Sequence, residues 1–430
     1  MNPEFKRNCW LQLTTSRLVT IPSVLAILLL TYYVNTHNNN PDFFTFGVTL
    51  FCFAGVWGAF SVGHSVFNER KENTWDQQRM NAISPWTMTW GKLFGSSAGA
   101  WYGGAICLVV MIVASVTTGT DKLVYIAILI SSTVFLSALF LLSALYAIQN
   151  DSRIGSGVLG IVALILLLQL IGIASSIGLH SNEMITWYDK PWDRLNFILA
   201  TITFFACSTV FAAWRLMRTA LQVRTLPWAL PLFILLLSGW LTGFSDEAFV
   251  TKFSFFVFIA GILITYASLF SEENGITIWR RIVARAKAAQ WQNMFEELPL
   301  WPMTLMLMIP AGIVLTIQTA AAQADSVAAD VVFAVFPHAV FAIIVLLLVI
   351  RDVAIILFFS FAVRPRRVFP KALGIIVLLN FILPTLIGWS VLVQLVQDAW
   401  FILIIAAIQM AIAIHCVLHR WSNYRLQPAG

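Results

Sequence analysis

Blocks of apolar residues, each long enough to form a membrane-spanning helix, follow one another along the whole chain. About 20 such residues in a helix cross the roughly 30 Å of bilayer hydrocarbon, and in lipid only helices or closed barrels satisfy the backbone. The pattern therefore predicts an all-α polytopic membrane protein with about twelve transmembrane helices. The predicted spans are 17–35, 43–66, 93–117, 123–148, 155–180, 195–217, 227–245, 249–270, 303–322, 331–363, 372–395 and 398–418.

Positive charges between these blocks fall on alternate loops. With the N-terminus in the cytoplasm, the loops on the opposite side hold only Lys122, Lys190, Arg194 and Lys252. Loops rich in Lys and Arg stay on the cytoplasmic side during insertion. The distribution predicts that the N- and C-termini are both cytoplasmic and that the protein is a multi-pass protein of the inner (cytoplasmic) membrane.

Composition narrows the class of protein further. Apolar residues make up 59% of the chain and charged residues 11%, against roughly 25% charged in a soluble domain. The net charge of +6 is spread over the predicted cytoplasmic loops, where anionic headgroups account for it, so a nucleic-acid partner is not expected. The five cysteines lie in predicted spans or cytoplasmic segments and imply no disulfide framework.

Short matches between the two parts of the chain indicate a tandem repeat. Trp86 recurs as Trp301, and Leu-Gly-Ile at 159–161 recurs at 373–375, at nearly the same offset. The prediction is two tandem six-helix halves, residues 1–222 and 223–430, with a substrate path between them. Chance matching among common apolar residues is the alternative.

The loop after the second predicted span, residues 68–92, carries a charged and aromatic motif. Its pattern comprises Glu69, Arg70, Glu72, Thr74, Pro85, Gly91 and Lys92. This loop resembles the segment between the second and third spans of type-2 ABC transporter permeases, the group that exports drugs, lipids and polysaccharides. Asn73 stands where that family prefers Gly. The segment before residue 17 is similar to the family's interfacial elbow helix.

The resemblance implies a permease subunit of an exporter, energised by separate cytoplasmic ABC ATPase subunits. It assigns an ATPase-coupling interface to loop 68–92 and to the second long loop, 271–302. The residues concerned are Glu69, Arg70, Glu72, Thr74, Trp75, Asp76, Glu272 and Glu273. Further membrane or periplasmic subunits are compatible with such a complex, and membrane lipids surround it.

Residue spacing gives the first loop a physical rationale. Glu69, Glu72, Asp76 and Arg79 fall on one face of a continuous helix, which predicts a charged surface for a partner. The alternative is an ordinary interfacial loop with solvated charges. The second loop instead predicts a basic amphipathic helix around Arg281, which is suited to anionic lipid.

The chain lacks the residues of an ATPase or another enzyme. Gly91-Lys92 is the only Gly-Lys pair, and no Gly stands four residues before it, so there is no Walker A loop. ATP is therefore expected on a partner, and no cofactor is expected in this chain. His415 and His419 have the spacing of a metal pair, but no carboxylate is near them in sequence, and no metal site is predicted.

Two further functions remain compatible with this pattern. The first is an ion-coupled secondary transporter with 6+6 spans. Its usual long central loop is missing, because the link around 218–226 is short. The second is a membrane scaffold or assembly subunit that transports nothing, which the low polarity of the spans allows.

Two features inside the predicted spans stand out. Glycines recur every four residues along the third span, which predicts close packing of another helix. They are Gly91, Gly95, Gly99 and Gly103.

His338, Arg351 and Asp352 are polar candidates within 331–363, where an unpaired charge costs at least about 2.5–3.5 kcal/mol. Because neighbours on a helix point about 100° apart, Arg351 and Asp352 are predicted not to pair with each other.

Overall fold

The computed structural model forms two compact units. Unit 1 comprises residues 1–186 and 190–225, and unit 2 comprises residues 187–189 and 226–430. The structure describes residues 2–36, 42–72, 74–80, 83–118, 122–149, 184–223, 228–244, 249–272, 274–324, 340–362, 368–382 and 399–423.

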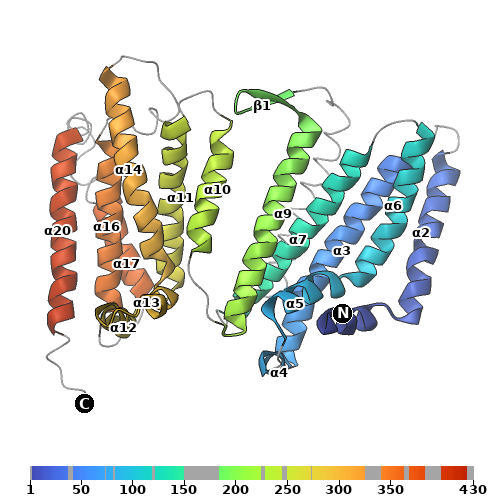
Figure 1. Ribbon diagram of the computed structural model, residues 1–430, viewed down its shortest axis with the longest axis horizontal. Coiled ribbons are helices and arrows are strands. Elements are labelled where there is room, and N and C mark those ends of the chain that lie inside the picture. Colours follow the sequence, from blue (N-terminus) through green and yellow to red (C-terminus); the bar gives the residue numbers. More distant parts are fainter. Residues whose placement is uncertain are drawn as a thin grey trace. The chain divides into compact units, whose positions relative to one another are not determined.

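Unit 1 is a bundle of long apolar helices with short helices at one end (Figure 1). Its elements are α1 (Pro3–Gln12), α2 (Thr15–Thr36), α3 (Phe43–Lys71), α4 (Trp75–Met80), α5 (Pro85–Trp90), the π-helix η2 (Gly91–Gly95), α6 (Ala98–Thr118), α7 (Leu123–Gln149) and α9 (Arg194–Ala220). We call the end that carries α1, α4 and α5 the basal end of unit 1.

Helix α3 is the centre of unit 1, because it packs against both α6 and α7, and α7 in turn packs against α9. Val62 and Met111 are fully buried in this packing. A two-stranded hairpin, β1 (Met184–Trp187) and β2 (Lys190–Asp193), precedes α9. Its turn residues Tyr188 and Asp189 have φ of 51° and 57°, as a tight two-residue hairpin turn requires.

Unit 2 is also built from long apolar helices, with a pair of short helices between two of them. Its elements are α10 (Ala229–Thr242), α11 (Phe249–Ser271), α12 (Ile276–Lys287), α13 (Trp291–Glu297), α14 (Leu300–Ala324), α16 (Phe341–Ser360), α17 (Val368–Val377), the π-helix η3 (Leu378–Ile382) and α20 (Ala399–Asn423). Helix α11 packs along α14, and α16 packs along α20. Phe258, Met308 and Leu315 are fully buried in the core.

The architecture confirms an all-α polytopic membrane protein. Within the described ranges, nine helices are long and apolar enough to cross a membrane. Helix α10 has 14 residues, or about 21 Å of helix, and the described part of the predicted span 372–395 contains the end of α17 and η3. The predicted span 155–180 lies outside the described residues.

Candidate functional site

Lys92, which has no exposed surface, occupies η2 at the basal end of unit 1. Its ammonium donates to the carboxylate of Glu69 on α3 and, at 3.5 Å, to Oε1 of Glu4 on α1. The ring centroid of Trp75, the first residue of α4, lies 5.5 Å from Lys92 Nζ. Carboxylates and an aromatic ring thus compensate an ammonium that is removed from water.

Arg7 completes this group of charges. Its Nη2 donates to Oε1 of Glu69 at 2.6 Å and to Oε1 of Glu4 at 2.9 Å. We call Glu4, Arg7, Glu69 and Lys92 the basal cluster. Two acids balance two bases, so the cluster is neutral when all four are charged. It ties together α1, α3 and η2, which are far apart in sequence.

Two glycines of η2 bring α1 close enough for these bonds. A Cβ at Gly91 would stand 2.7 Å from Glu4 Cβ, and one at Gly95 would stand 2.8 Å from Asn8 Cβ. The buried Asn8 amide donates to Glu4 Oε1 at 3.1 Å and to the Gly91 carbonyl at 3.3 Å. Only glycine lets the two helices approach this closely.

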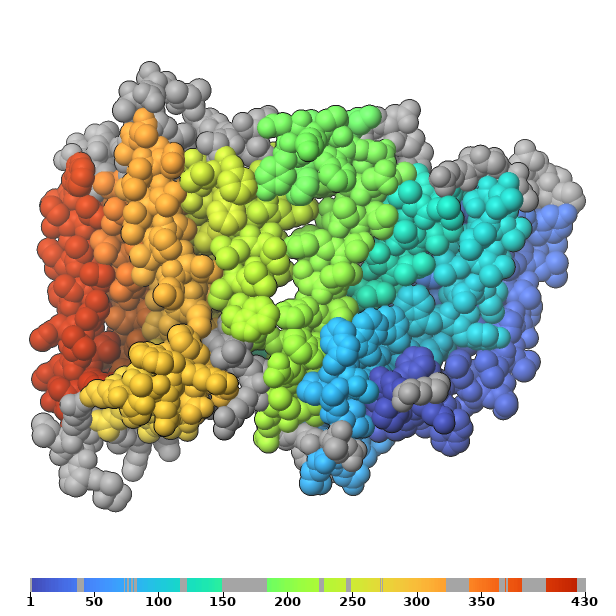
Figure 2. Space-filling view, viewed as in Figure 1, coloured from blue at the N-terminus to red at the C-terminus, as the bar shows by residue number. Residues whose placement is uncertain are grey.

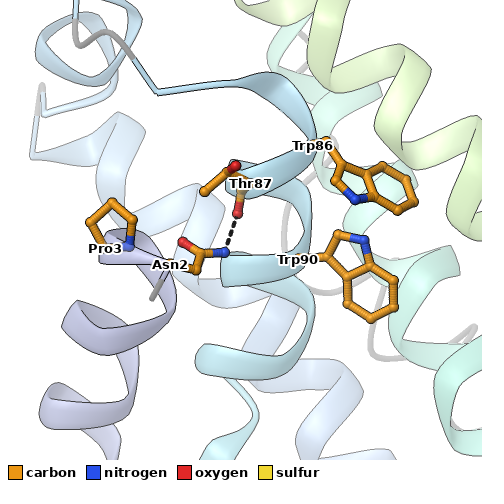
Figure 3. A pocket seen from close by; sticks show the side chains of 5 residues that line it. All are labelled: Asn2, Pro3, Trp86, Thr87 and Trp90. Atoms are coloured by element: carbon orange, nitrogen blue, oxygen red, sulfur yellow. Dashed lines mark hydrogen bonds between the residues drawn. The ribbon is translucent and has the colours of Figure 1, made fainter.

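The start of α1 is also fastened to α5. Asn2 caps α1 by accepting from the backbone N–H groups of Glu4 and Phe5 at 3.0 and 3.2 Å. The Asn2 amide donates to the Thr87 carbonyl at 2.6 Å, as Figure 3 shows. With Pro3, Trp86 and Trp90, these residues line an open cleft of about 570 Å³.

An aromatic row continues from this cleft. The rings of Trp214 and Trp86 lie 5.9 Å apart, those of Trp86 and Trp90 lie 5.4 Å apart, and Trp90 stacks on Phe94 at 4.8 Å. In Figure 3 the indoles of Trp86 and Trp90 project from the same side of α5. Amphipathic indoles of this kind anchor a helix end at a membrane–water interface.

The predicted coupling residues of the first loop have different environments. Thr74 Oγ1 donates to the Glu69 carbonyl at 3.1 Å and helps to close α3, while Trp75 is buried. Arg70 is half-buried, and Glu72 is exposed at the surface. Glu69 points into the basal cluster, where 12% of its side chain is exposed. Asp76 belongs to α4.

The prediction of one continuous charged helical face was wrong. Helix α3 ends at Lys71, and α4 begins at Trp75, so Glu69 and Glu72 do not share a helix with Asp76 and Arg79. The backbone N–H groups of Glu72 and Thr74 bond back to the last turn of α3. This ends the helix and removes the periodic face.

In the second loop, Glu272 also has an internal contact. Its Oε2 accepts from the Leu300 backbone N–H at 2.9 Å, at the start of α14. Burial raises the pKa of the Glu272 carboxyl above its ordinary value. The nearby Asn274 accepts a bond from Trp301 Nε1 at 2.9 Å. Glu273 lies outside the described residues.

A second polar site lies inside unit 2, and it corrects another expectation. Arg351 and Asp352 do pair: Arg351 Nε and Nη2 donate to Asp352 Oδ1 at 2.8 and 2.6 Å. Their side chains are 1% and 2% exposed. The long arginine side chain folds back toward its neighbour, which the 100° separation of the two Cβ directions does not prevent. Away from water, pairing lowers the cost of both charges.

Three neutral side chains complete this network. Arg351 Nη1 donates to Gln409 Oε1 at 2.5 Å, and Nη2 donates to Asn380 Oδ1 at 2.8 Å. Tyr266 donates its hydroxyl proton to Asp352 Oδ2 at 2.6 Å. We call these five residues the Arg351 network. It connects α11, α16, η3 and α20, with every charged oxygen and every guanidinium nitrogen bonded.

The glycine stripe of the third span lies along the N-terminal helices. Beyond Gly91 and Gly95, a Cβ at Gly103 would stand 3.2 Å from Ile21 Cγ2 on α2. A Cβ at Gly99 would stand 3.9 Å from its nearest neighbour, the Gln12 carbonyl oxygen. His338 lies outside the described residues. In the part of the chain that the structure describes, no three His, Cys, Asp or Glu residues form a metal-binding group.

Sequence reasoning did not single out Glu4, Tyr266, Asn380 or Gln409. The last three are polar residues inside otherwise apolar segments, and that rarity was the available signal. Glu4 carried no signal, because an acid in the first turn of an interfacial helix is ordinary.

No family model, curated protein or solved structure matches this chain.

Proposed function

We propose that the chain is the membrane-spanning permease subunit of an ATP-driven ABC exporter of the type-2 group, located in the inner membrane. In this proposal it crosses the membrane about twelve times as two six-span halves, and both termini are cytoplasmic. The basal end of unit 1 then faces the cytoplasm. ATP is bound and hydrolysed by separate ATPase subunits.

The observation that carries the proposal is the basal cluster. A permease driven from the cytoplasm needs a rigid connection between the loop that receives the force and the spans that move. The Lys92–Glu69 pair joins the end of α3 to the start of the next span across the α4–α5 loop. Arg7 adds the interfacial helix α1 to the same connection.

The exposed residues of this loop define the docking face. Glu72 and Gln77 are exposed, and Met80 is 81% exposed. An exposed methionine in the same loop as an exposed acid and an exposed amide is a suitable contact for a soluble partner. In this arrangement Glu69 positions the loop, and Glu72 and Met80 contact the ATPase.

The Arg351 network favours a second candidate function, ion-coupled secondary transport. Charged groups buried inside membrane spans often mark ion or proton pathways. Here each carboxylate oxygen and each guanidinium nitrogen already has a hydrogen-bond partner within unit 2. A group that must exchange its partner during transport is better left with an open position, so we rank this function second.

A co-purification experiment separates the two functions. The tagged chain is purified in mild detergent from its own cells and assayed for ATP hydrolysis, alone and with the proteins that accompany it. The proposal expects negligible turnover by the chain alone and hydrolysis in the complex with a soluble ATPase. Uptake into proteoliposomes driven by an ion gradient, without ATP, would refute it.

A further inference from the structure

Helix α12 of unit 2 has two unlike faces. Ile276 and Ile282 are buried, and the ring of Trp279 lies 5.3 Å from that of Trp301 on α14. On the outer side, 62% of the Arg281 side chain is exposed, and Lys287 is also exposed. The apolar face is thus already covered by unit 2 itself, and the basic face points outward.

Helix α13 adds exposed aromatic rings beside these cations. Trp291 is 57% exposed and Phe295 is 39% exposed, and their i, i+4 spacing places them on one side of the helix. Ala289, with φ of 55°, makes the tight turn between α12 and α13. The rings and the cations therefore belong to one short helical hairpin.

Internal bonds hold this hairpin in shape. Arg285 Nη2 pairs with Glu297 Oε1 at 2.9 Å, and Arg285 Nη1 donates to the Asn293 carbonyl at 2.8 Å. Arg285 is therefore committed to the hairpin itself. Arg281 Nη1 lies 3.9 Å from Glu297 Oε1, at the limit of an ion pair, and most of the Arg281 side chain is exposed.

The hairpin lies at the level where two spans end. Helix α11 ends at Ser271, and α14 begins at Leu300, so the chain is tethered on both sides. Figure 2 shows this part of unit 2, in dark yellow, projecting at the front of its lower end. Where apolar spans end, hydrocarbon gives way to phospholipid headgroups.

We propose that Arg281, Lys287, Trp291 and Phe295, here called the basic ledge, bind the headgroups of anionic phospholipids. The two cations pair with phosphate, and the two rings enter the boundary between headgroups and acyl chains. The ledge lies between the end of α11 and the start of α14, and in this proposal that level is the level of the headgroups. This inference stands on the fold and does not depend on transport.

The test uses the purified full-length chain in detergent at low salt, with dioleoyl phosphatidylglycerol or dioleoyl phosphatidylcholine added. Thermal unfolding is followed against lipid concentration. Phosphatidylglycerol is expected to stabilise the wild type at lower concentration than phosphatidylcholine. Arg281→Gln with Lys287→Gln should lower the apparent affinity for phosphatidylglycerol by roughly 30-fold, since each cation near an anionic surface contributes about fivefold.

Lys71→Gln with Lys190→Gln is the matched control, because it removes two exposed cations that belong to different elements of unit 1 and form no common surface, and it should lower the lipid affinity less than the ledge substitutions do. The effect should also shrink in high salt, which tests the proposal on the wild type even where a variant folds poorly. Equal stabilisation by the two lipids, or an unchanged response of the double variant, overturns it. Loss of a co-purifying protein with unchanged lipid response overturns it too, and assigns the ledge to a protein partner.

Discussion

Lys92 and Glu69 form an ion pair at the basal end of unit 1, across 23 positions of sequence that contain two short helices and their connections. The ammonium is fully buried and the carboxylate nearly so. The pair therefore fixes where the loop α4–α5 leaves the bundle and where it returns.

Replacing Lys92 by Met should destabilise the protein by about 3–5 kcal/mol, because the two carboxylates of Glu4 and Glu69 then share Arg7 as their one cation in the basal cluster. Chemical or thermal unfolding of the purified chain measures the change. Adding Glu69→Gln should recover part of the loss, which a double-mutant cycle quantifies. Lys71→Met, at an exposed cation, is the control and should change stability by less than about 0.5 kcal/mol. Equal effects of the two lysine substitutions would contradict the internal role.

Two acids of the same loop should behave differently. Glu72→Ala alters an exposed side chain and should leave expression and unfolding unchanged while weakening ATPase association, which co-purification measures. Glu69→Ala should instead lower stability, since it leaves Lys92 and Arg7 with one carboxylate, that of Glu4, between them. Undiminished association of the Glu72→Ala protein would show that this acid is only solvated.

Alanine substitutions at Gly95 and Gly99 test how closely α1 packs against η2 and the start of α6. Gly95→Ala places a methyl 2.8 Å from Asn8 Cβ, whereas Gly99→Ala meets no atom closer than 3.9 Å. We expect a loss of about 1–3 kcal/mol for Gly95→Ala and little change for Gly99→Ala. Burial raises the pKa of the Cys9 thiol, so displacing α1 should speed Cys9 modification by a maleimide. Equal labelling rates in both variants would contradict the close packing.

Arg351→Leu and Asp352→Leu should each destabilise unit 2 by about 3–5 kcal/mol, because each leaves the other charge buried without its partner. The double variant should be more stable than the sum of the single losses predicts, by about 0.5–3 kcal/mol. Thermal unfolding of all four proteins measures this coupling. Strict additivity would show that the two charges act independently.

The buried carboxyl of Glu272 should make the stability of the folded protein depend on pH. Its pKa is raised by burial, so the folded state holds its proton more tightly than the unfolded state. The contribution of Glu272 to stability is therefore fully present below the unfolded pKa and is lost as pH rises through the folded pKa. Glu272→Gln should flatten the decline of stability above the ordinary pKa of 4.5 and still accept the Leu300 N–H bond. Unfolding curves at a series of pH values provide the measurement, and identical slopes in both proteins would refute it.

The spans could be predicted from the sequence because hydrocarbon imposes a strict requirement. A segment that crosses lipid must be apolar over a helical length, and that condition is visible at α3, α7, α11 and α16 without any knowledge of packing. The resemblance to an elbow helix predicted α1 before the first span, and the amphipathic pattern around Arg281 predicted the basic helix α12 between two spans.

The partners of the charged side chains could not be read in this way. Glu69 appeared to face outward because regular periodicity was assumed through Asn73, but the helix ends at Lys71 and the carboxylate turns toward Lys92. Arg351 was expected to avoid Asp352, yet its side chain folds back to it. The environment of each segment is a local property of its residues, whereas an ion pair depends on which helices the fold brings together. The sequence determined that the chain crosses the membrane, and the tertiary structure decided which of its few charges meet.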